Sequence, residues 1–275
     1  MFTLNCKGSL WTIRLPVVMG IINATPDSFF SKSRATGLEA AVATAARMIR
    51  EGAAILDIGG QSTRPDAVLM GEAEEIDRVV PVISAIHQAF PGIVLSVDTY
   101  YPAVAKAAVA AGASLVNDIS GGRYDADMLP AVAALNVPYI LMHSTGTAAT
   151  MHEKSISGNI TLEVVNYFKE RLQACTAAGI KDVILDPGLG FGKTMEQNFQ
   201  LLKELNGLQL FHLPVLLGIS RKTMIHKTLQ ITPEESLNGT TVLNTIGLLN
   251  KVNILRVHDV KEAAQAVQLV NALHP

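Results

Sequence analysis

The 275-residue sequence is poor in cysteine, in charge and in long apolar runs. Its two cysteines, Cys6 and Cys175, are too few for a disulfide framework or a zinc site. No apolar segment approaches the ~20 residues that span a bilayer, and the first residues lack the basic-then-apolar order of a signal peptide. We therefore expect a cytoplasmic protein without a membrane partner.

Charged residues make up only 17% of the chain, and the 22 basic residues nearly balance the 24 acidic ones. A nucleic-acid-binding protein usually presents a strongly basic face, so this balance argues against nucleic acid as a partner. A hydrophobic content of 49% argues against disorder. Because no Pro- or Ser-rich linker interrupts the chain, we expect residues 1–275 to form a single domain.

The sequence does contain an alternation of short apolar runs with helical patterns. Eight runs are typical of strands buried on both faces: 17–22, 54–58, 93–97, 115–116, 138–142, 183–185, 215–217 and 254–257. Helical spacing occupies segments between them: 38–51, 72–90, 102–111, 160–178 and 234–250. Residues 2–14 predict a short hairpin that turns at Lys7 and Gly8 and covers one end of the sheet.

Eight strands that alternate with helices predict an α/β protein with a single (β/α)8 TIM barrel. The first and last strands end near Asn23 and Arg256, which leaves each of the seven intervals about 33 residues. That length accommodates one strand, one helix and their loops. A doubly wound open sheet is the structural alternative.

Polar residues follow the predicted strands at their carboxyl ends. They are Asn23, Asp57, Asp98, Asn117, Met142-His143, Asp186, residues 220–222 and residues 256–258. In a TIM barrel these ends converge on one mouth, where the functional site is built. Each residue taken singly could instead cap a helix or form a turn, and that alternative stays open for each of them.

The same residues lie in ordered motifs that span residues 18–260. The motifs are VMGIINATPDSF (18–29), ILDIGGQSTRP (55–65), SVDT (96–99), GASLVNDISGG (112–122), ILMH (140–143), LDPGLGFGK (185–193), GISRK (218–222) and ILRVHDV (254–260). This series resembles the dihydropteroate synthase family of pterin-binding TIM barrels. The resemblance implies a transferase of folate biosynthesis that condenses 6-hydroxymethyl-7,8-dihydropterin pyrophosphate with p-aminobenzoate and is a target of sulfonamides.

The resemblance also implies roles for individual residues. The substrate-binding set is Asp57, Thr63, Arg64, Asp98, Asn117, Met142, Asp186, Phe191, Ser220, Lys222, Arg256 and His258. Asp98, Lys222 and Arg256 would be catalytic, and Asn23 would hold the Mg2+ that assists the loss of pyrophosphate. Family members are generally homodimers, which the apolar faces of 235–250 and 262–273 allow.

Within the substrate set, the resemblance divides the binding work. Asp186 and Asn117 would bind the pterin ring, and Asp98 would bond its other edge and stabilise the positive charge that develops as pyrophosphate leaves. Arg256 and His258 would receive the pyrophosphate. Of the remaining residues, Ser220 would receive the benzoate carboxylate, Phe191 would line the site of the benzoate ring, Met142 would pack beside the pterin, and Phe29, Thr63, Arg64 and Pro65 would close over the aniline.

The glycine-rich segment 188–193 is not a Walker A phosphate loop. Gly188 and Gly192 are separated by three residues, where that loop needs four.

Departures from the family pattern keep two other functions open. Gln61 replaces a usual Glu, and segments 29–36 and 143–147 differ from the family pattern. The alternatives are a pterin-binding barrel that transfers a methyl group to a corrinoid protein, and a non-catalytic pterin-binding homologue.

Overall fold

The chain begins with an antiparallel hairpin. In the computed structural model, which describes residues 1–24, 34–61, 70–146, 150 and 158–273, strand β1 (Phe2–Cys6) pairs with β2 (Ser9–Ile13). The turn residues Lys7 and Gly8 both have positive φ, which matches the twist of a two-residue hairpin. The predicted hairpin is confirmed.

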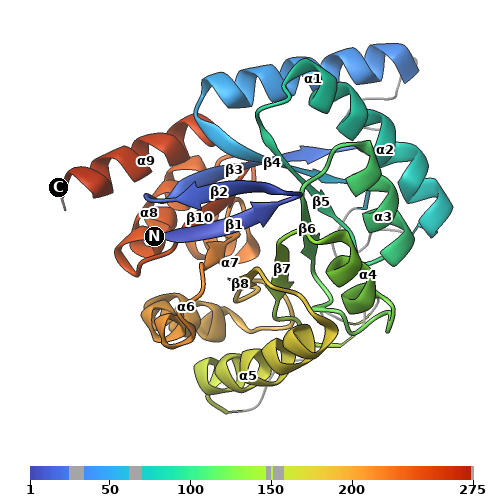
Figure 1. The fold of residues 1–275 in the computed structure, drawn as a ribbon. Helices are drawn as coiled ribbons and strands as arrows, with labels where there is room; N and C mark the ends of the chain where they lie inside the picture. The colour runs from blue at the N-terminus through green and yellow to red at the C-terminus, as the bar shows by residue number, and fades with distance from the viewer. Residues whose placement is uncertain (25–33, 62–69, 147–149, 151–157, 274–275) are drawn as a thin grey trace.

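The next eight strands form one parallel sheet that closes into a barrel (Figure 1). The strands are β3 (Val17–Asn23), β4 (Ala53–Gly59), β5 (Val94–Asp98), β6 (Leu115–Asp118), β7 (Tyr139–Met142), β8 (Val183–Asp186), β9 (Leu216–Leu217) and β10 (Ile254–Val257). Their order is β8-β7-β6-β5-β4-β3-β10-β9, and a parallel bridge between Leu185 and Val215 joins the two ends. The predicted TIM barrel is confirmed, and the open sheet is wrong.

Helices surround the barrel (Figure 1). They are α1 (Arg34–Arg50), α2 (Glu72–Ala89), α3 (Pro102–Ala111), α4 (Met128–Leu135), α5 (Ile160–Ala178), α6 (Met195–Lys203), α7 (Thr223–Leu229), α8 (Leu237–Leu249) and α9 (Val260–Ala272), with a 3-10 helix η2 (Leu205–Phe211) after α6. The sequence pattern missed α4, α6 and α7, because each has fewer than ten residues and too few turns to show a period. No helix within the described ranges is long and apolar enough to cross a membrane.

The hairpin closes the amino-terminal end of the barrel. Leu4, Cys6 and Ile13 pack against buried residues from the strands: Met19, Ile55, Val94, Leu115, Ile140, Ile184, Leu216 and Ile254. A larger apolar cluster fills the space between the outer faces of the strands and the helices. The strands are buried on both faces, as continuous apolar runs predict, and the hairpin covers their amino-terminal ends, so their carboxyl ends are the place for a functional site in this barrel.

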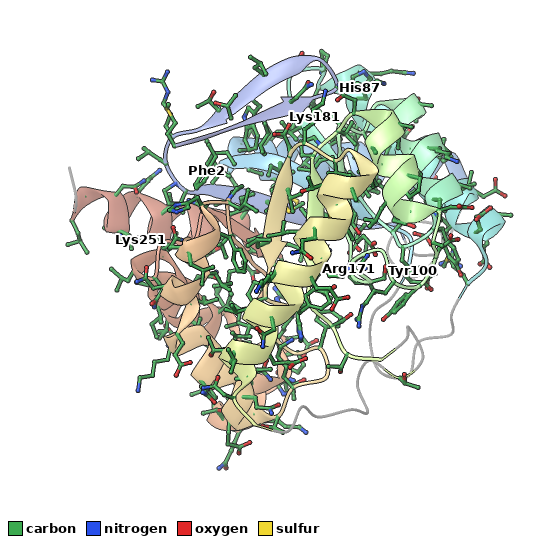
Figure 2. The ribbon with its side chains drawn as sticks, turned by 60° about the horizontal axis from the view of Figure 1, so that its bottom comes forward. Phe2, His87, Tyr100, Arg171, Lys181 and Lys251 are labelled. Atoms are coloured by element: carbon green, nitrogen blue, oxygen red, sulfur yellow. The ribbon has the colours of Figure 1, made fainter. Side chains whose placement is uncertain are left out.

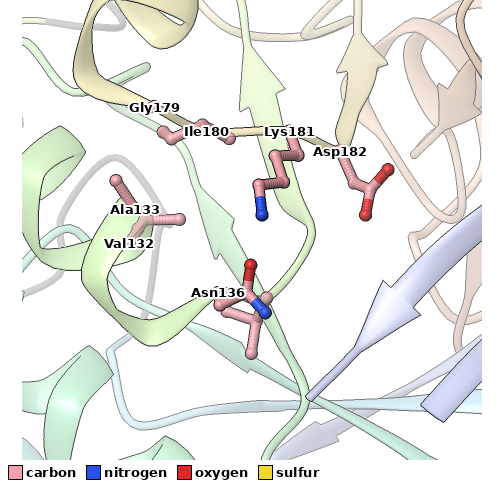
Figure 3. A pocket seen from close by; sticks show the side chains of 8 residues that line it. Val132, Ala133, Asn136, Gly179, Ile180, Lys181 and Asp182 are labelled. Atoms are coloured by element: carbon pink, nitrogen blue, oxygen red, sulfur yellow. The ribbon is translucent and has the colours of Figure 1, made fainter. Parts of the chain in front are cut away.

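A small pocket lies away from those carboxyl ends (Figure 3). It is lined by residues 132–133, 136–137 and 179–182, which precede β7 and β8. Asp182, in its wall, accepts a hydrogen bond from the backbone N–H of Asn5 in the hairpin at 2.8 Å. Figure 2 shows Lys181 near the hairpin and Tyr100 toward the other end of the barrel. The pocket therefore belongs to the closed end of the barrel.

Candidate active site

Four of the predicted residues meet at the carboxyl ends of β4, β5, β6 and β10. Arg256 donates from Nε to Asp57 Oδ2 and from Nη2 to Asp98 Oδ2, both at 2.6 Å. Asn117 donates from Nδ2 to the same Asp57 oxygen at 3.0 Å. Adjacent strands explain this arrangement, because Asp98 pairs in register with Asn117 on one side and with Gly59 on the other.

Burial and neighbouring charges act together in this cluster of Asp57, Asp98, Asn117 and Arg256. Burial raises the pKa of Asp98 to about 7; the Arg256 guanidinium opposes that shift and Asp57 adds to it. Burial opposes the charge on Arg256, but Asp57 and Asp98 raise its pKa, so it stays a cation. Asp57 is fully buried, and its Oδ1 has no hydrogen-bond partner among the described residues. That oxygen can accept a hydrogen bond from a ligand.

A second group of predicted residues lies at the ends of β8 and β9. Asp186 accepts at Oδ1 from the Gly188 N–H at 2.8 Å, and Lys222 donates from Nζ to Leu189 O. The same Nζ lies 4.5 Å from the ring centroid of Phe191. Burial raises the pKa of Asp186, and the charge of Lys222 opposes that shift. Burial also lowers the pKa of Lys222 to about 8, although Asp186 favours its charged form.

Ser220 and His258, which the sequence assigned to different ligand groups, are in direct contact. Ser220 Oγ lies 3.1 Å from His258 Nδ1 and 3.3 Å from the backbone N–H of the same residue, which donates to it. The neighbouring Arg221 turns away and forms an ion pair with Asp259 at 2.7 Å. Lys222 is therefore the cation of the 220–222 motif that faces Asp186.

The remaining predicted residues have different outcomes. Asn23 ends β3, is exposed, and pairs in register with Gly59. Met142 is buried and packs with Tyr100 and Ile119, near Phe191. Phe29, Thr63, Arg64 and Pro65 lie outside the described residues, so their predicted roles stay predictions.

Sequence reasoning missed several polar residues that bind the backbone of the segment 120–122, which follows β6. Asp118 is fully buried and accepts from Tyr139 Oη at 2.6 Å and from the backbone N–H groups of Ser120 and Gly122. Burial raises the pKa of Asp118, and these hydrogen bonds oppose that shift. Arg171 lies on helix α5 (Figure 2), and its Nε donates to Gly121 O at a distance of 3.0 Å. The sequence signal for these residues was the pair Gly121-Gly122 in the SGG motif, because the backbone groups of this turn need hydrogen-bond partners from other side chains.

Lys193 was also missed, because it appeared only as the last residue of a failed Walker motif. Its Nζ lies 2.9 Å from His143 Nδ1 and donates to Gly188 O at 2.7 Å. Glu75, buried in helix α2, accepts at Oε2 from Gln61 at 3.3 Å. In the described part of the chain, no three His, Cys, Asp or Glu side chains come together as a metal site.

Comparison with known proteins agrees with this geometry. The profile of the family described as "Pterin binding enzyme" matches residues 19–258. Dihydropteroate synthase of Escherichia coli is 41% identical over 271 residues, covering 98% of this chain and 95% of that one. A structure of the Xanthomonas albilineans enzyme with 4-aminobenzoic acid has a TM-score of 0.91 at 41% identity and covers 98% of this chain and 97% of that one. A second structure of the Xanthomonas enzyme, in complex with 7,8-dihydropteroate, has a TM-score of 0.87 at 39% identity, and each chain is covered to 98%.

The barrel fold and these relatives thus define a transferase, and the chain belongs to the family of pterin-binding enzymes that comprises the dihydropteroate synthases. Its activity is dihydropteroate synthesis in folate biosynthesis: it condenses 6-hydroxymethyl-7,8-dihydropterin pyrophosphate with p-aminobenzoate and releases pyrophosphate. The resemblance read from the sequence motifs is confirmed.

Proposed function

We propose that the pterin ring binds between the two groups of residues at the barrel mouth. The carboxylate of Asp186 accepts from the 2-amino group and the adjacent ring N–H, a bidentate pair stronger than two neutral hydrogen bonds. Asn117 and the unpartnered Asp57 Oδ1 supply further polar contacts from the opposite strands. Support for this placement comes from the burial of all three side chains, since a buried polar group is stable only with a partner.

Asp98 is assigned the electrostatic role in the reaction. The bond between the exocyclic carbon and the pyrophosphate oxygen breaks, and its electron pair leaves with pyrophosphate. The carbon becomes positive until the amine of p-aminobenzoate attacks it; the amine then loses a proton to water. A carboxylate at ~4 Å from that charge contributes about 4 kcal/mol at an effective dielectric near 20, which corresponds to about three decades in rate. The observation that carries the proposal is the 2.6 Å contact that Arg256 makes with Asp98 at the barrel mouth.

The leaving pyrophosphate is assigned to Arg256 and His258, with Mg2+ held through Asn23. The exposed carboxamide of Asn23 lies at the barrel mouth, and its oxygen is a hard ligand. It fits an ion that takes its other ligands from pyrophosphate and water, as Mg2+ commonly does. When bound, Mg2+ would neutralise negative charge on the leaving group. Arg256 and His258 orient the pyrophosphate from the end of β10, which lies between β3 and β9 in the sheet.

The p-aminobenzoate site is assigned to the region of Lys222, Phe191 and Ser220. Phe191 and the Lys222 ammonium already contact each other, so an aromatic ring and a cation are available side by side. Ser220 Oγ, oriented by His258, can bond the benzoate carboxylate. Thr63 and Arg64, predicted to cover the aniline, complete this assignment.

Pyrophosphate release by Asp98→Asn tests the electrostatic role. We expect release to fall by about a thousandfold while the pterin pyrophosphate still binds, because the variant keeps the shape and loses the charge. The assay compares release with and without p-aminobenzoate and with and without Mg2+. Asp77→Asn, an exposed change on helix α2, is the matched control. Equal rates for Asp98→Asn and wild type would refute the role.

We further propose that residues 1–275 act as one domain in a cytoplasmic homodimer. The hairpin shares its apolar cluster with all eight strands, which supports a single domain.

Val242 and Leu249 of α8 and Leu269 of α9 are at least half exposed, and such an apolar surface supports association. Both cysteines are free and buried, in keeping with a reducing compartment. Analytical ultracentrifugation of wild type and Val242→Glu tests the dimer, and cell fractionation tests the location.

A further inference from the structure

The turn 188–192, which follows β8, is tied to the end of β7 by one ammonium group. Lys193 Nζ lies 2.7 Å from Gly188 O, 3.2 Å from Phe191 O and 3.4 Å from His143 O, and it contacts His143 Nδ1 at 2.9 Å. Four acceptors from two separate segments therefore surround a single lysine. An ammonium has three protons to donate, so this surrounding satisfies it fully.

The charge states of the partners define the direction of the contact with His143. Burial lowers the pKa of His143 to about 2, with help from the charges of Lys193 and Arg123, so its ring is neutral. Tyr167 lies edge-on to the ring, with centroids 4.8 Å apart. A neutral imidazole has one acceptor nitrogen, and an ammonium can only donate, so a charged Lys193 requires the tautomer of His143 in which Nδ1 is the acceptor. Burial, then the charge of Lys222, lowers the pKa of Lys193 to about 7, and the charge of Asp186 opposes that shift.

The same turn positions two residues of the proposed active site. Leu189 O accepts the hydrogen bond from Lys222 Nζ, and the Gly188 N–H donates to Asp186 Oδ1. The turn also packs closely on β7, since a Cβ at Gly188 would lie 1.8 Å from His143 O. A shift of this turn would move the acceptor that orients Lys222.

We propose that Lys193 is a positioning residue for the condensation: its ammonium holds the turn 188–192 against β7 and thereby fixes the direction of the Lys222 amine. Lys193 need not touch substrate for this role. The inference rests on the proposed function of Lys222. It assigns a task to the lysine that ends the LGFGK motif, which the failed phosphate-loop pattern left without one.

Chemical rescue tests the proposal. Lys193→Ala removes three methylene groups and the ammonium, and propylammonium has the matching length. We expect kcat for dihydropteroate formation to fall about 10–100-fold, the range for a charged hydrogen-bonding group, and added propylammonium to restore at least a third of it. Propanol, which lacks the charge, should not rescue. Lys203→Ala, at the exposed end of α6, should keep the wild-type kcat.

Companion variants separate this inference from the function on which it rests. Lys222→Ala should lose activity and show no rescue under the conditions that rescue Lys193→Ala. If Lys222→Ala is fully active, the proposed function of Lys222 fails. If Lys222→Ala is impaired but Lys193→Ala is active, or is folded and not rescued, the positioning role fails. Should Lys193→Ala not fold, Lys193→Met decides: a tenfold loss of kcat at an unchanged melting temperature supports the role, and any smaller loss overturns it.

Discussion

Arg256 donates from Nε to Oδ2 of Asp57 at 2.6 Å, across 199 residues of the chain. The two side chains come from β10 and β4, which flank β3 in the barrel. The same guanidinium donates to Asp98 on β5, so one cation on β10 links the acids of β4 and β5. Barrel closure thus assembles a charge cluster that no local stretch of sequence contains.

Replacing Arg256 with Met should shift the pH dependence of the reaction. Burial and neighbouring carboxylates keep the pKa of Asp98 raised to about 7, and Arg256 is the cation that opposes this. Without it the pKa rises further, so the ionised carboxylate is lost at higher pH as the solution is acidified. The acidic limb of pyrophosphate release should move upward by at least about one pH unit. A profile from pH 6 to 10 measures this, with Arg221→Met, which breaks the surface pair with Asp259, as the control.

Replacing Glu75 with Gln should stabilise the protein at alkaline pH. Burial raises the pKa of Glu75 from 4.5 to about 7, so the folded state holds a proton that the unfolded chain has released. Stability of the wild type therefore falls as pH rises from about 4.5 to 7 and stays lowered above that, by ~3 kcal/mol for this group. Gln61 Nε2 is already placed to donate to the side chain. Urea unfolding at pH 5 and pH 8 should show the difference between variant and wild type growing with pH. Glu72→Gln, exposed on the same helix, should show no such growth.

Replacing Gly188 with Ala should disrupt the turn after β8. Gly188 has φ +63°, which costs about 1–2 kcal/mol for a residue with a Cβ, and that Cβ would overlap His143 O. We expect a loss of about 3 kcal/mol in unfolding free energy and a matching loss of activity. Thermal unfolding followed by circular dichroism measures the first. Gly207→Ala, which meets no atom within 4 Å, should change stability by under about 0.5 kcal/mol. Equal melting temperatures for the two variants would contradict the expectation.

Replacing Asn23 with Ala should raise the Mg2+ requirement. If its carboxamide oxygen is a metal ligand, the Mg2+ concentration for half-maximal pyrophosphate release should increase by at least about tenfold. Removing Mg2+ with a chelator should suppress release by the wild type. Asn206→Ala, exposed on η2, is the matched control. An unchanged Mg2+ dependence in Asn23→Ala would remove Asn23 from the assignment.

The strands and the hairpin were predictable because each carries a local signal. The run 183–185 is apolar, the run 254–257 is apolar except for Arg256, and Lys7-Gly8 forms the turn expected of its sequence. The short helix α7, with seven residues, carries no period, so the sequence could not show it.

The candidate site was predictable in membership but not in pairing. Strand order places Asp57, Asp98 and Arg256 at one mouth, yet their hydrogen bonds depend on side-chain directions that only the closed barrel sets. Lys193 and Glu75 escaped prediction because each has a partner from another segment, His143 for Lys193 and Gln61 for Glu75. Their importance lies in burial and in contacts, which leave no pattern along the chain.

The bridge between Leu185 and Val215 makes the barrel wall uneven. Elsewhere adjacent strands share runs of paired residues, whereas β8 and the segment before β9 meet through this bridge, and β9 itself has two residues. In native-state hydrogen exchange, the amides of this seam should therefore open earlier than those of β3 and β4. Asp186 and Lys222 stand on opposite sides of the seam, so breathing of the wall there would alter the separation of the acid and the amine.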